Sequence, residues 1–332
     1  MRRRIGTRGS PLALFQANAV SALLHAHAHV ECDIVVIRTS GDRLSEAPLS
    51  EAGGKRLFVK EIEDALLTGN IDLAVHSSKD MPVVLPEGLA IGATLPREDA
   101  RDAVVLPVRH QEGAETAGVS GLDVPFDALL ARLGSAPTIG TSSVRRTAQL
   151  ARLFPGARFL PIRGNLDTRL RKLDGGGYDA IVLASAGLIR LNQRARISTA
   201  LSTTACVPAP GQGVIAIEVR AGDEDVVTRV ARIDDRHSRI ALDAERAVVA
   251  GLGGGCQMPI GAFATVSDGV VEVMAIVLSL DGTRVLHAES RGPMKEANTV
   301  GHAVAEQLRV QGADVILASV AGEQTPVRGL SS

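Results

Sequence analysis

Short apolar runs rich in β-branched residues alternate with helical patterns over the first two-thirds of the chain. This alternation is typical of βα units, in which helices cover the faces of a largely parallel sheet. The pattern predicts strands at residues 4–7, 33–38, 71–76, 89–94, 103–106, 138–140, 158–162, 179–183 and 214–219, and helices at residues 11–25, 58–67, 126–133, 144–154 and 166–173. We therefore expect an α/β protein.

The order strand, helix, strand, helix, strand occurs twice. Ile5-Gly6-Thr7 opens the first set and Ile139-Gly140-Thr141 opens the second. In each set, a helix leads through glycine to a buried strand, at 71–75 and at 178–182. This duplication predicts two similar lobes, and the loops that follow their strands should meet at a shared cleft.

The same patterns predict three domains. Domain 1 covers 1–99 and is completed by a return segment, 212–231, whose apolar stretch predicts one more buried strand. Domain 2 covers 102–207. Domain 3 covers 236–332, where a helix ends near 252, strands follow at 263–266, 270–280 and 284–290, and another helix covers 298–310. This last order predicts a smaller α+β domain with an antiparallel sheet. We interpret residues 223–235 as a charged connector.

Composition excludes several classes of protein. The net charge is −1 and only 2% of residues are aromatic, so neither bulk charge nor base stacking indicates nucleic-acid binding. Three cysteines do not make a disulfide framework. No apolar run approaches the length of about 18 residues that would suggest a membrane helix, and no signal peptide follows the first arginines. We expect a cytoplasmic protein with no membrane partner.

Arginine dominates the cations, because only five of the 36 cationic residues are lysine. Arginine binds carboxylate and phosphate through a bidentate fork, although a GC-rich genome also replaces surface lysine by arginine. Six arginines fall on or beside the predicted loops after strands: Arg8, Arg145, Arg146, Arg163, Arg169 and Arg190. Scattered surface arginine would not favour those loops, so we expect a polyanionic ligand.

Two segments at predicted strand ends could carry chemistry. Lys79 and Asp80 precede Pro82, which places them in a loop after a buried strand, where they could act as acid, base or cation stabiliser. A solvated ion pair in a turn is the alternative. Thr141, Ser142 and Ser143 lead directly into the helix that carries Arg145 and Arg146. Free N–H groups, hydroxyls and guanidinium groups together form an anion site, whereas the alternative is an ordinary serine N-cap.

A glycine run precedes Cys256. Such a run can present a thiol with little obstruction, as an attachment site would need, although a small buried core residue is the common alternative. No histidine or second cysteine has the spacing of a metal site, and no phosphate-binding glycine motif occurs. We therefore predict no metal, and nucleotide binding loses its usual support.

Together these segments resemble the porphobilinogen deaminase family, also called hydroxymethylbilane synthases. The resemblance covers almost the whole chain, in family order, through residues 8–13, 54–61, 76–82, 140–146, 163–165, 208–213 and 254–261. It implies two lobes similar to type II periplasmic binding proteins, followed by a third domain. It also implies a dipyrromethane cofactor joined to Cys256 by a thioether.

The resemblance implies an activity as well. A member of this family condenses four porphobilinogen molecules head to tail, releases ammonia at each step and frees hydroxymethylbilane for the next enzyme of tetrapyrrole biosynthesis. Such a protein is expected to be a monomer. Because each pyrrole carries an acetate and a propionate, the growing chain is a polycarboxylate that needs several arginine partners. This requirement agrees with the arginines at the predicted cleft.

Roles for individual residues follow from their places in the family motifs. Asp80 would stabilise positive charge on the ring nitrogens and move protons, next to Lys79. Cofactor carboxylates would be held by Lys79, Ser143, Arg145, Arg146 and Arg169. Substrate or the moving chain would meet Arg8, Ser10, Thr141, Ser142, Arg163, Arg190 and Gln212, the last in the hinge-like turn.

Some positions depart from the family pattern. Gly253 stands where an acidic residue is common, and Ser78 stands where a larger apolar residue is common. The stretch 107–136 is longer than is typical. A two-lobed anion-binding module without catalysis is the main competing interpretation, and Cys256 argues against it. A phosphoryl-transfer enzyme is weakened by the missing phosphate-binding motifs.

Overall fold

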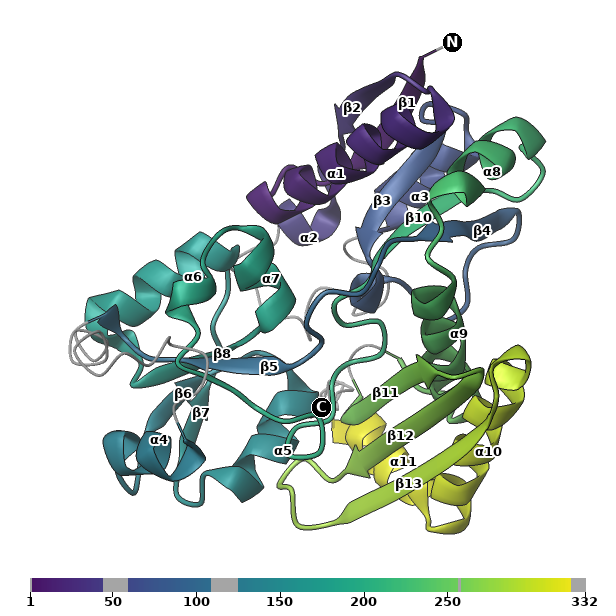
Figure 1. Cartoon of the computed structure of the whole chain (residues 1–332). Helices are drawn as coiled ribbons and strands as arrows, with labels where there is room; N and C mark the ends of the chain where they lie inside the picture. Colours follow the sequence, from purple (N-terminus) through teal and green to yellow (C-terminus); the bar gives the residue numbers. More distant parts are fainter. Residues whose placement is uncertain (1, 44–58, 109–124, 256–257, 324–332) are drawn as a thin grey trace, which may run out of the picture.

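The computed structural model describes residues 2–43, 59–108, 125–255 and 258–323 (Figure 1). Lobe 1 contains a five-stranded sheet in the order β2-β1-β3-β10-β4. Its strands are β1 (Arg3–Thr7), β2 (Cys32–Val36), β3 (Leu73–Ser77), β4 (Leu89–Thr94) and β10 (Ile215–Arg220). β1 pairs in parallel with β2 and β3, whereas β10 runs antiparallel between β3 and β4. The predicted return strand at 214–219 is thereby confirmed.

Helices cover both faces of this sheet. α1 (Pro11–Ala28) and α8 (Glu224–Val230) contribute Val20, Leu24 and Val226 to one core. α3 (Lys60–Leu67) packs Ile62 and Leu66 on the other face, and the short α2 (Ser40–Arg43) lies beside the strand ends. Ser10 starts α1 as an N-cap that accepts from the Ala13 N–H.

Lobe 2 repeats this plan with the strand order β7-β6-β8-β5-β9. Its strands are β5 (Asp102–Val105), β6 (Thr138–Gly140), β7 (Arg158–Leu160), β8 (Ala180–Ala184) and β9 (Thr199–Ala200). One core lies beneath α4 (Phe126–Leu133) and α5 (Val144–Leu153), and the other beneath α6 (Leu166–Lys172) and α7 (Ser185–Arg190). β5, the fourth strand in the order, is antiparallel to β8, as β10 is to β3 in lobe 1. The predicted duplication is confirmed.

Two crossovers join the lobes. The first, residues 95–101, leads from β4 to β5, and the second, residues 201–214, leads from β9 to β10. They touch each other, because the Glu98 N–H donates to the Gly213 carbonyl at 3.0 Å. Each lobe therefore contains one strand that the chain reaches only by crossing from the other lobe.

Domain 3 is the predicted α+β domain. α9 (Arg236–Gly251) leads to the antiparallel strands β11 (Ile260–Ser267), β12 (Val270–Leu278) and β13 (Val285–Pro293), which are followed by α10 (Ala297–Val310) and α11 (Ala313–Glu323). α9, α10 and α11 cover one face of the sheet. The other face meets lobe 2, where Ile276 and Leu278 pack with Ala148 of α5.

Several predictions about local structure were wrong. The charged connector at 223–235 contains α8, because Asp223 caps it and Val226 and Val230 face the lobe 1 core. The short β9, α7 and the apolar α11 were not predicted. No helix in the described part of the chain is long and apolar enough to cross a membrane.

Candidate active site

The Lys79 and Asp80 segment follows β3 directly. Within the predicted connection after the strand, it forms a single 3₁₀ turn, η1 (Ser78–Asp80). The Ser78 N–H donates to the Val214 carbonyl of the second crossover at 3.0 Å, and the Met81 N–H closes the turn on the Ser78 carbonyl. The first of these bonds holds the turn against the second crossover. Asp80 is exposed at its end.

Lys79 lies among charges from both lobes. Burial and the nearby positive charge of Arg146 lower the pKa of Lys79 to about 8, although Asp80 and Asp102 act in the opposite direction. Its ammonium lies 3.4 Å from the Gln212 side-chain oxygen. The pKa of Lys79 is therefore well below the usual lysine value of about 10.4.

The serine and threonine residues before α5 shape that loop. Ser143 is the N-cap of α5, as the alternative interpretation also predicted, and accepts from the Arg146 N–H. The Ser142 hydroxyl bonds to both the carbonyl and the N–H of Ile162. The Thr141 hydroxyl oxygen accepts from the Ser143 N–H at 3.2 Å. All three hydroxyls thus have partners within the protein.

Arg145 and Arg146 converge on one carboxylate that sequence reasoning missed. Asp102 is fully buried at the start of β5, 2.7 Å from Arg145 Nη1 and 2.8 Å from Arg146 Nη2. Burial opposes its charge, but the two arginines outweigh that effect and hold the pKa of Asp102 well below its usual range. Gln212 Nε2 also donates to Asp102, at 2.9 Å.

The two arginines differ in how many side-chain N–H donors remain available to a ligand. All three side-chain nitrogens of Arg146 donate within the protein, two to Asp102 and one to the Val182 carbonyl. Arg145 directs Nη1 to Asp102 and to the Val207 carbonyl. Its buried Nε has no hydrogen-bond partner among the described residues. Arg145 therefore retains donor capacity that Arg146 has largely used.

Arg169 reaches the same cluster from α6. Its Nε donates to the Gly164 carbonyl at 2.9 Å. Burial and the charge of Arg146 lower the pKa of Arg169 to about 10, with Asp80 opposing, and Arg163 and Arg8 contribute in the same direction as Arg146. Because Asp80 and Arg8 belong to lobe 1, these interactions place charges from both lobes together at the cleft.

Three further candidates have partners within the protein: Arg8, Arg190 and Gln212. Arg8 is paired with Asp42 at 2.5 Å. Arg190 donates to the Gly213 carbonyl at 2.7 Å, and burial lowers its pKa. Gln212 is buried, with its amide committed to the Ala100 carbonyl and Asp102, so the structure shows it tying the crossovers together rather than facing open solvent.

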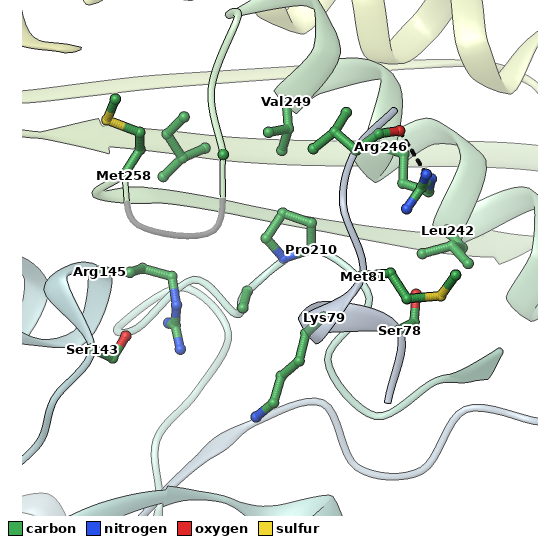
Figure 2. A pocket seen from close by; sticks show the side chains of 14 residues that line it. Ser78, Lys79, Met81, Ser143, Arg145, Pro210, Leu242, Arg246, Val249 and Met258 are labelled. Carbon is green, nitrogen blue, oxygen red and sulfur yellow. Dashed lines mark hydrogen bonds between the residues drawn. The ribbon is translucent and has the colours of Figure 1, made fainter. Parts of the chain in front are cut away.

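A pocket lies where the three domains meet (Figure 2). Lys79 and Arg145 line it, together with Pro210 of the second crossover and Leu242 of α9. Gly255 and Met258, the described residues on either side of 256–257, line it as well. Cys256 itself lies outside the described residues. The described neighbours of Cys256 are thus beside the cationic cluster.

The two departures from the family pattern have local consequences. Gly253 has φ +64°, a left-handed conformation that glycine adopts at less cost than a residue with a side chain. The hydroxyl of Ser78 is buried beside the pocket and has no hydrogen-bond partner among the described residues. A larger apolar side chain would occupy some of this space.

Comparison with known proteins decides the family. Residues 3–228 match the family model for the dipyrromethane cofactor binding domain of porphobilinogen deaminase, and residues 240–310 match the model for its C-terminal domain. This chain belongs to the porphobilinogen deaminase family. It is 43% identical to the porphobilinogen deaminase of Chromobacterium violaceum over 320 residues, covering 96% of this chain and 98% of the relative.

Other proteins show further similarity. The porphobilinogen deaminase of Syntrophobacter fumaroxidans is 42% identical over 318 residues, with 96% of this chain and 97% of the relative covered. Among solved structures, an ancestral cationic amino acid solute binding protein aligns with a TM-score of 0.40 and 15% identity, over 70% of this chain and 87% of that one. The resemblance stated from the motifs is confirmed at the level of the family.

Sequence reasoning missed a second buried carboxylate, Glu245 of α9. It is fully buried and accepts hydrogen bonds from Arg97 of the first crossover, from the Gly211 N–H of the second crossover and from the Ala264 N–H of β11, each at 2.7 Å. A signal existed, because a glutamate between Leu242 and Val249 lies on the apolar face of a helix.

Proposed function

We propose that this protein joins four porphobilinogen molecules head to tail into hydroxymethylbilane, releases one ammonia at each condensation and frees the product by hydrolysis. The observation that supports this most directly is the cationic cluster at the cleft. It combines Lys79 of lobe 1 with Arg145, Arg146 and Arg169 of lobe 2. Asp80, the proposed acid, lies at the edge of the same cluster.

The residues present fit a dipyrromethane cofactor. The leading charge partners of Lys79 and Arg169 among the described residues include Arg145, Arg146 and the carboxylates of Asp80 and Asp102, so cations outnumber carboxylates there and further anionic groups would be stabilised. The buried Arg145 Nε, which lacks a partner among the described residues, is suited to donate to one of them. We assign cofactor carboxylates to Lys79, Ser143, Arg145, Arg146 and Arg169, with Arg146 acting mainly through its charge.

When bound, dipyrromethane supplies the free pyrrole carbon to which the first substrate is joined. Each condensation breaks the carbon–nitrogen bond of an aminomethyl group, forms a carbon–carbon bond and displaces one ring proton. Positive charge develops on the substrate pyrrole as ammonia leaves. The exposed carboxylate of Asp80 would stabilise that charge and accept the displaced proton.

The substrate-facing residues divide into two groups. Arg8, Arg163 and Arg190 carry guanidinium groups that could meet substrate carboxylates. Ser10, Thr141, Ser142 and Gln212 already have hydrogen-bond partners within the protein, so we propose that they contribute by fixing the loops at the cleft. Asp42 would hold the Arg8 guanidinium in position until substrate arrives.

Attachment through a thioether to Cys256 completes the proposal. The glycine run and the position of Gly255 and Met258 at the pocket support it. We further propose that the protein acts as a monomer in the cytoplasm and passes its product to the next enzyme of the pathway. The sparse cysteines are consistent with a reducing compartment. The proposed domain limits are 1–99 with 212–231, 102–207 and 236–332.

Mass spectrometry of the purified protein tests the attachment. The peptide containing Cys256 should carry the mass of two linked pyrroles. Cys256→Ala should lose this mass, whereas Cys32→Ala, a half-buried cysteine of β2, should retain it. An active preparation in which Cys256 is unmodified would refute the attachment.

Turnover of porphobilinogen tests the proposed role of Asp80. Asp80→Asn should fold and carry the cofactor but condense porphobilinogen at least about a hundredfold more slowly, within the range usual for loss of an acid or base. The matched control is Asp127→Asn, an exposed aspartate of α4, which should turn over normally. Normal turnover by Asp80→Asn would show that another group does this chemistry.

A further inference from the structure

Asp102 is a buried carboxylate that the proposed chemistry does not use. It is fully buried, although burial of a carboxylate is unfavourable unless its charge is well compensated. Compensation comes from Arg145 and Arg146 of α5, from the Gln212 amide and from the Cys206 thiol, which lies 3.3 Å away. Because so many groups bind this one side chain, we looked for a function that Asp102 has beyond stabilising the fold.

The position of Asp102 in the fold suggests that role. It begins β5, directly after the first crossover, and Gln212 lies on the second crossover. Gln212 donates to Asp102 at 2.9 Å, while its oxygen lies 3.4 Å from the Lys79 ammonium. One continuous set of contacts therefore runs from Lys79 of lobe 1, through Gln212 and Asp102, to the two arginines of lobe 2.

Asp102 fixes and partly neutralises Arg145 before a ligand binds. Two adjacent guanidinium groups repel each other, and a long arginine side chain loses conformational freedom when a ligand fixes it. Asp102 removes both costs in advance, because it neutralises part of the charge and fixes Nη1 of Arg145 at 2.7 Å. The Nε of that guanidinium remains without a partner among the described residues. A group fixed beforehand captures its ligand with less loss of entropy.

We propose that Asp102 is a positioning residue for cofactor capture: it holds Arg145, and through Gln212 also Lys79, in place before any pyrrole carboxylate arrives. This inference rests on the proposed function. Asp102 touches no substrate in this scheme and acts only through the residues that do. Its carboxylate orders the two arginines in advance, so that a ligand carboxylate does not have to do so on binding.

Capture of the cofactor by the apo-protein tests the inference. The protein, produced in a host that cannot make porphobilinogen, is mixed with porphobilinogen, and the gain of mass is followed over time. Asp102→Asn should load about tenfold more slowly or worse, as expected for loss of one charge-assisted contact. Asp99→Asn, which changes a carboxylate of the same crossover that pairs with Arg101, should load at a rate close to that of the original protein.

The pH dependence of loading separates positioning from simple support of the fold. The charged groups around Lys79 are Asp80 of η1, Asp102 of β5, and Arg145 and Arg146 of α5. Because Asp102 raises the pKa of Lys79, its removal should move the alkaline fall in loading to lower pH. Asp102→Glu, which restores the charge, should move it back. A purely structural role would lower thermal stability without shifting this fall.

The outcomes are distinguishable. If the original apo-protein gains no mass, the proposed function fails. If it loads and Asp102→Asn loads equally fast with the same pH dependence, only the positioning role fails. If Asp102→Asn does not fold, Gln212→Met is used instead, since it breaks the contact with Lys79 and leaves the arginine pairs intact. Unchanged loading by a folded Gln212→Met protein would overturn the link to Lys79.

Discussion

Glu245 joins domain 3 to both crossovers, and its removal provides a quantitative test of the architecture. Its carboxylate is fully buried and accepts from Arg97, from the Gly211 N–H and from the Ala264 N–H, each at 2.7 Å. Glu245→Ala would leave the partly buried Arg97 guanidinium and two buried N–H groups without this acceptor. Glu245→Gln keeps the shape but replaces one acceptor oxygen by a donor that faces another donor.

The structure sets the size of the effect. Breaking a buried ion pair by removing one partner costs about 3–5 kcal/mol; because Arg97 is 14% exposed, Glu245→Ala should lower the free energy of unfolding by about 3 kcal/mol, the lower end of that range. Glu245→Gln loses the charge and one acceptor and should lose about 2 kcal/mol, the usual value of one hydrogen bond to a charged group. Three contacts at 2.7 Å place both figures above the effects of ordinary surface changes.

Urea unfolding followed by circular dichroism measures these losses. The matched control is Glu306→Gln, an exposed glutamate of α10, which should change stability by no more than about 0.5 kcal/mol. Domain 3 could also unfold separately in the Glu245 variants, which would appear as a second transition. If the midpoints of Glu245→Gln and Glu306→Gln coincide, the three contacts do not hold the domains together as described.

Three further predictions concern the crossovers and the cleft. Gly213→Ala should lower the thermal stability of the protein more than Gly269→Ala. Both glycines have positive φ (+87° and +77°), but only at Gly213 would a Cβ meet backbone, 2.3 Å from the Glu98 oxygen. Equal losses of stability would contradict the close approach of the crossovers. Lys79, with its pKa of about 8, is charged below that pH and neutral above it, so turnover should fall as pH rises through about 8. Lys79→Arg should keep any activity it retains to higher pH. If Lys79→Arg and the original protein have the same pH profile, Lys79 is not the titrating group. Asp42→Asn should raise KM for porphobilinogen a few-fold, by about 1 kcal/mol of lost orientation, with little change in Tm, because the Arg8 guanidinium loses the charge of the Asp42 carboxylate. An unchanged KM would show that Asp42 does not position Arg8.

Secondary structure was predictable where hydrophobic periodicity decides it. The strands β4 and β6 and the helix α4 have the predicted limits, because apolar side chains in these segments face a core. α8 was missed since its sequence is mostly polar and only two valines, Val226 and Val230, make its buried stripe. An aspartate before valines at i and i+4 is nevertheless a helix signal.

The site was predictable in part, for a topological reason. Arginines on loops after strands meet at one cleft because the duplicated sheets bring the carboxyl ends of their strands together. Asp102 escaped notice because its partners Arg145 and Arg146 are far away in sequence and no local pattern distinguishes a buried carboxylate at a strand start from an exposed one. Gln212 was assigned to substrate, although its amide is used within the protein.

The two crossovers explain why so many buried polar contacts lie between the domains. The chain passes from β4 in lobe 1 to β5 in lobe 2, and from β9 in lobe 2 back to β10 in lobe 1. Both sheets are therefore completed through the same two connections. Gln212 of the second crossover donates to Asp102 at the end of the first, on the side of the cleft. Glu245 of domain 3 accepts hydrogen bonds from both crossovers. A change in spacing between the lobes must therefore alter the contacts of Lys79 and the arginines. The charged groups of the cleft and all three domains are thus connected through hydrogen bonds of the two crossovers.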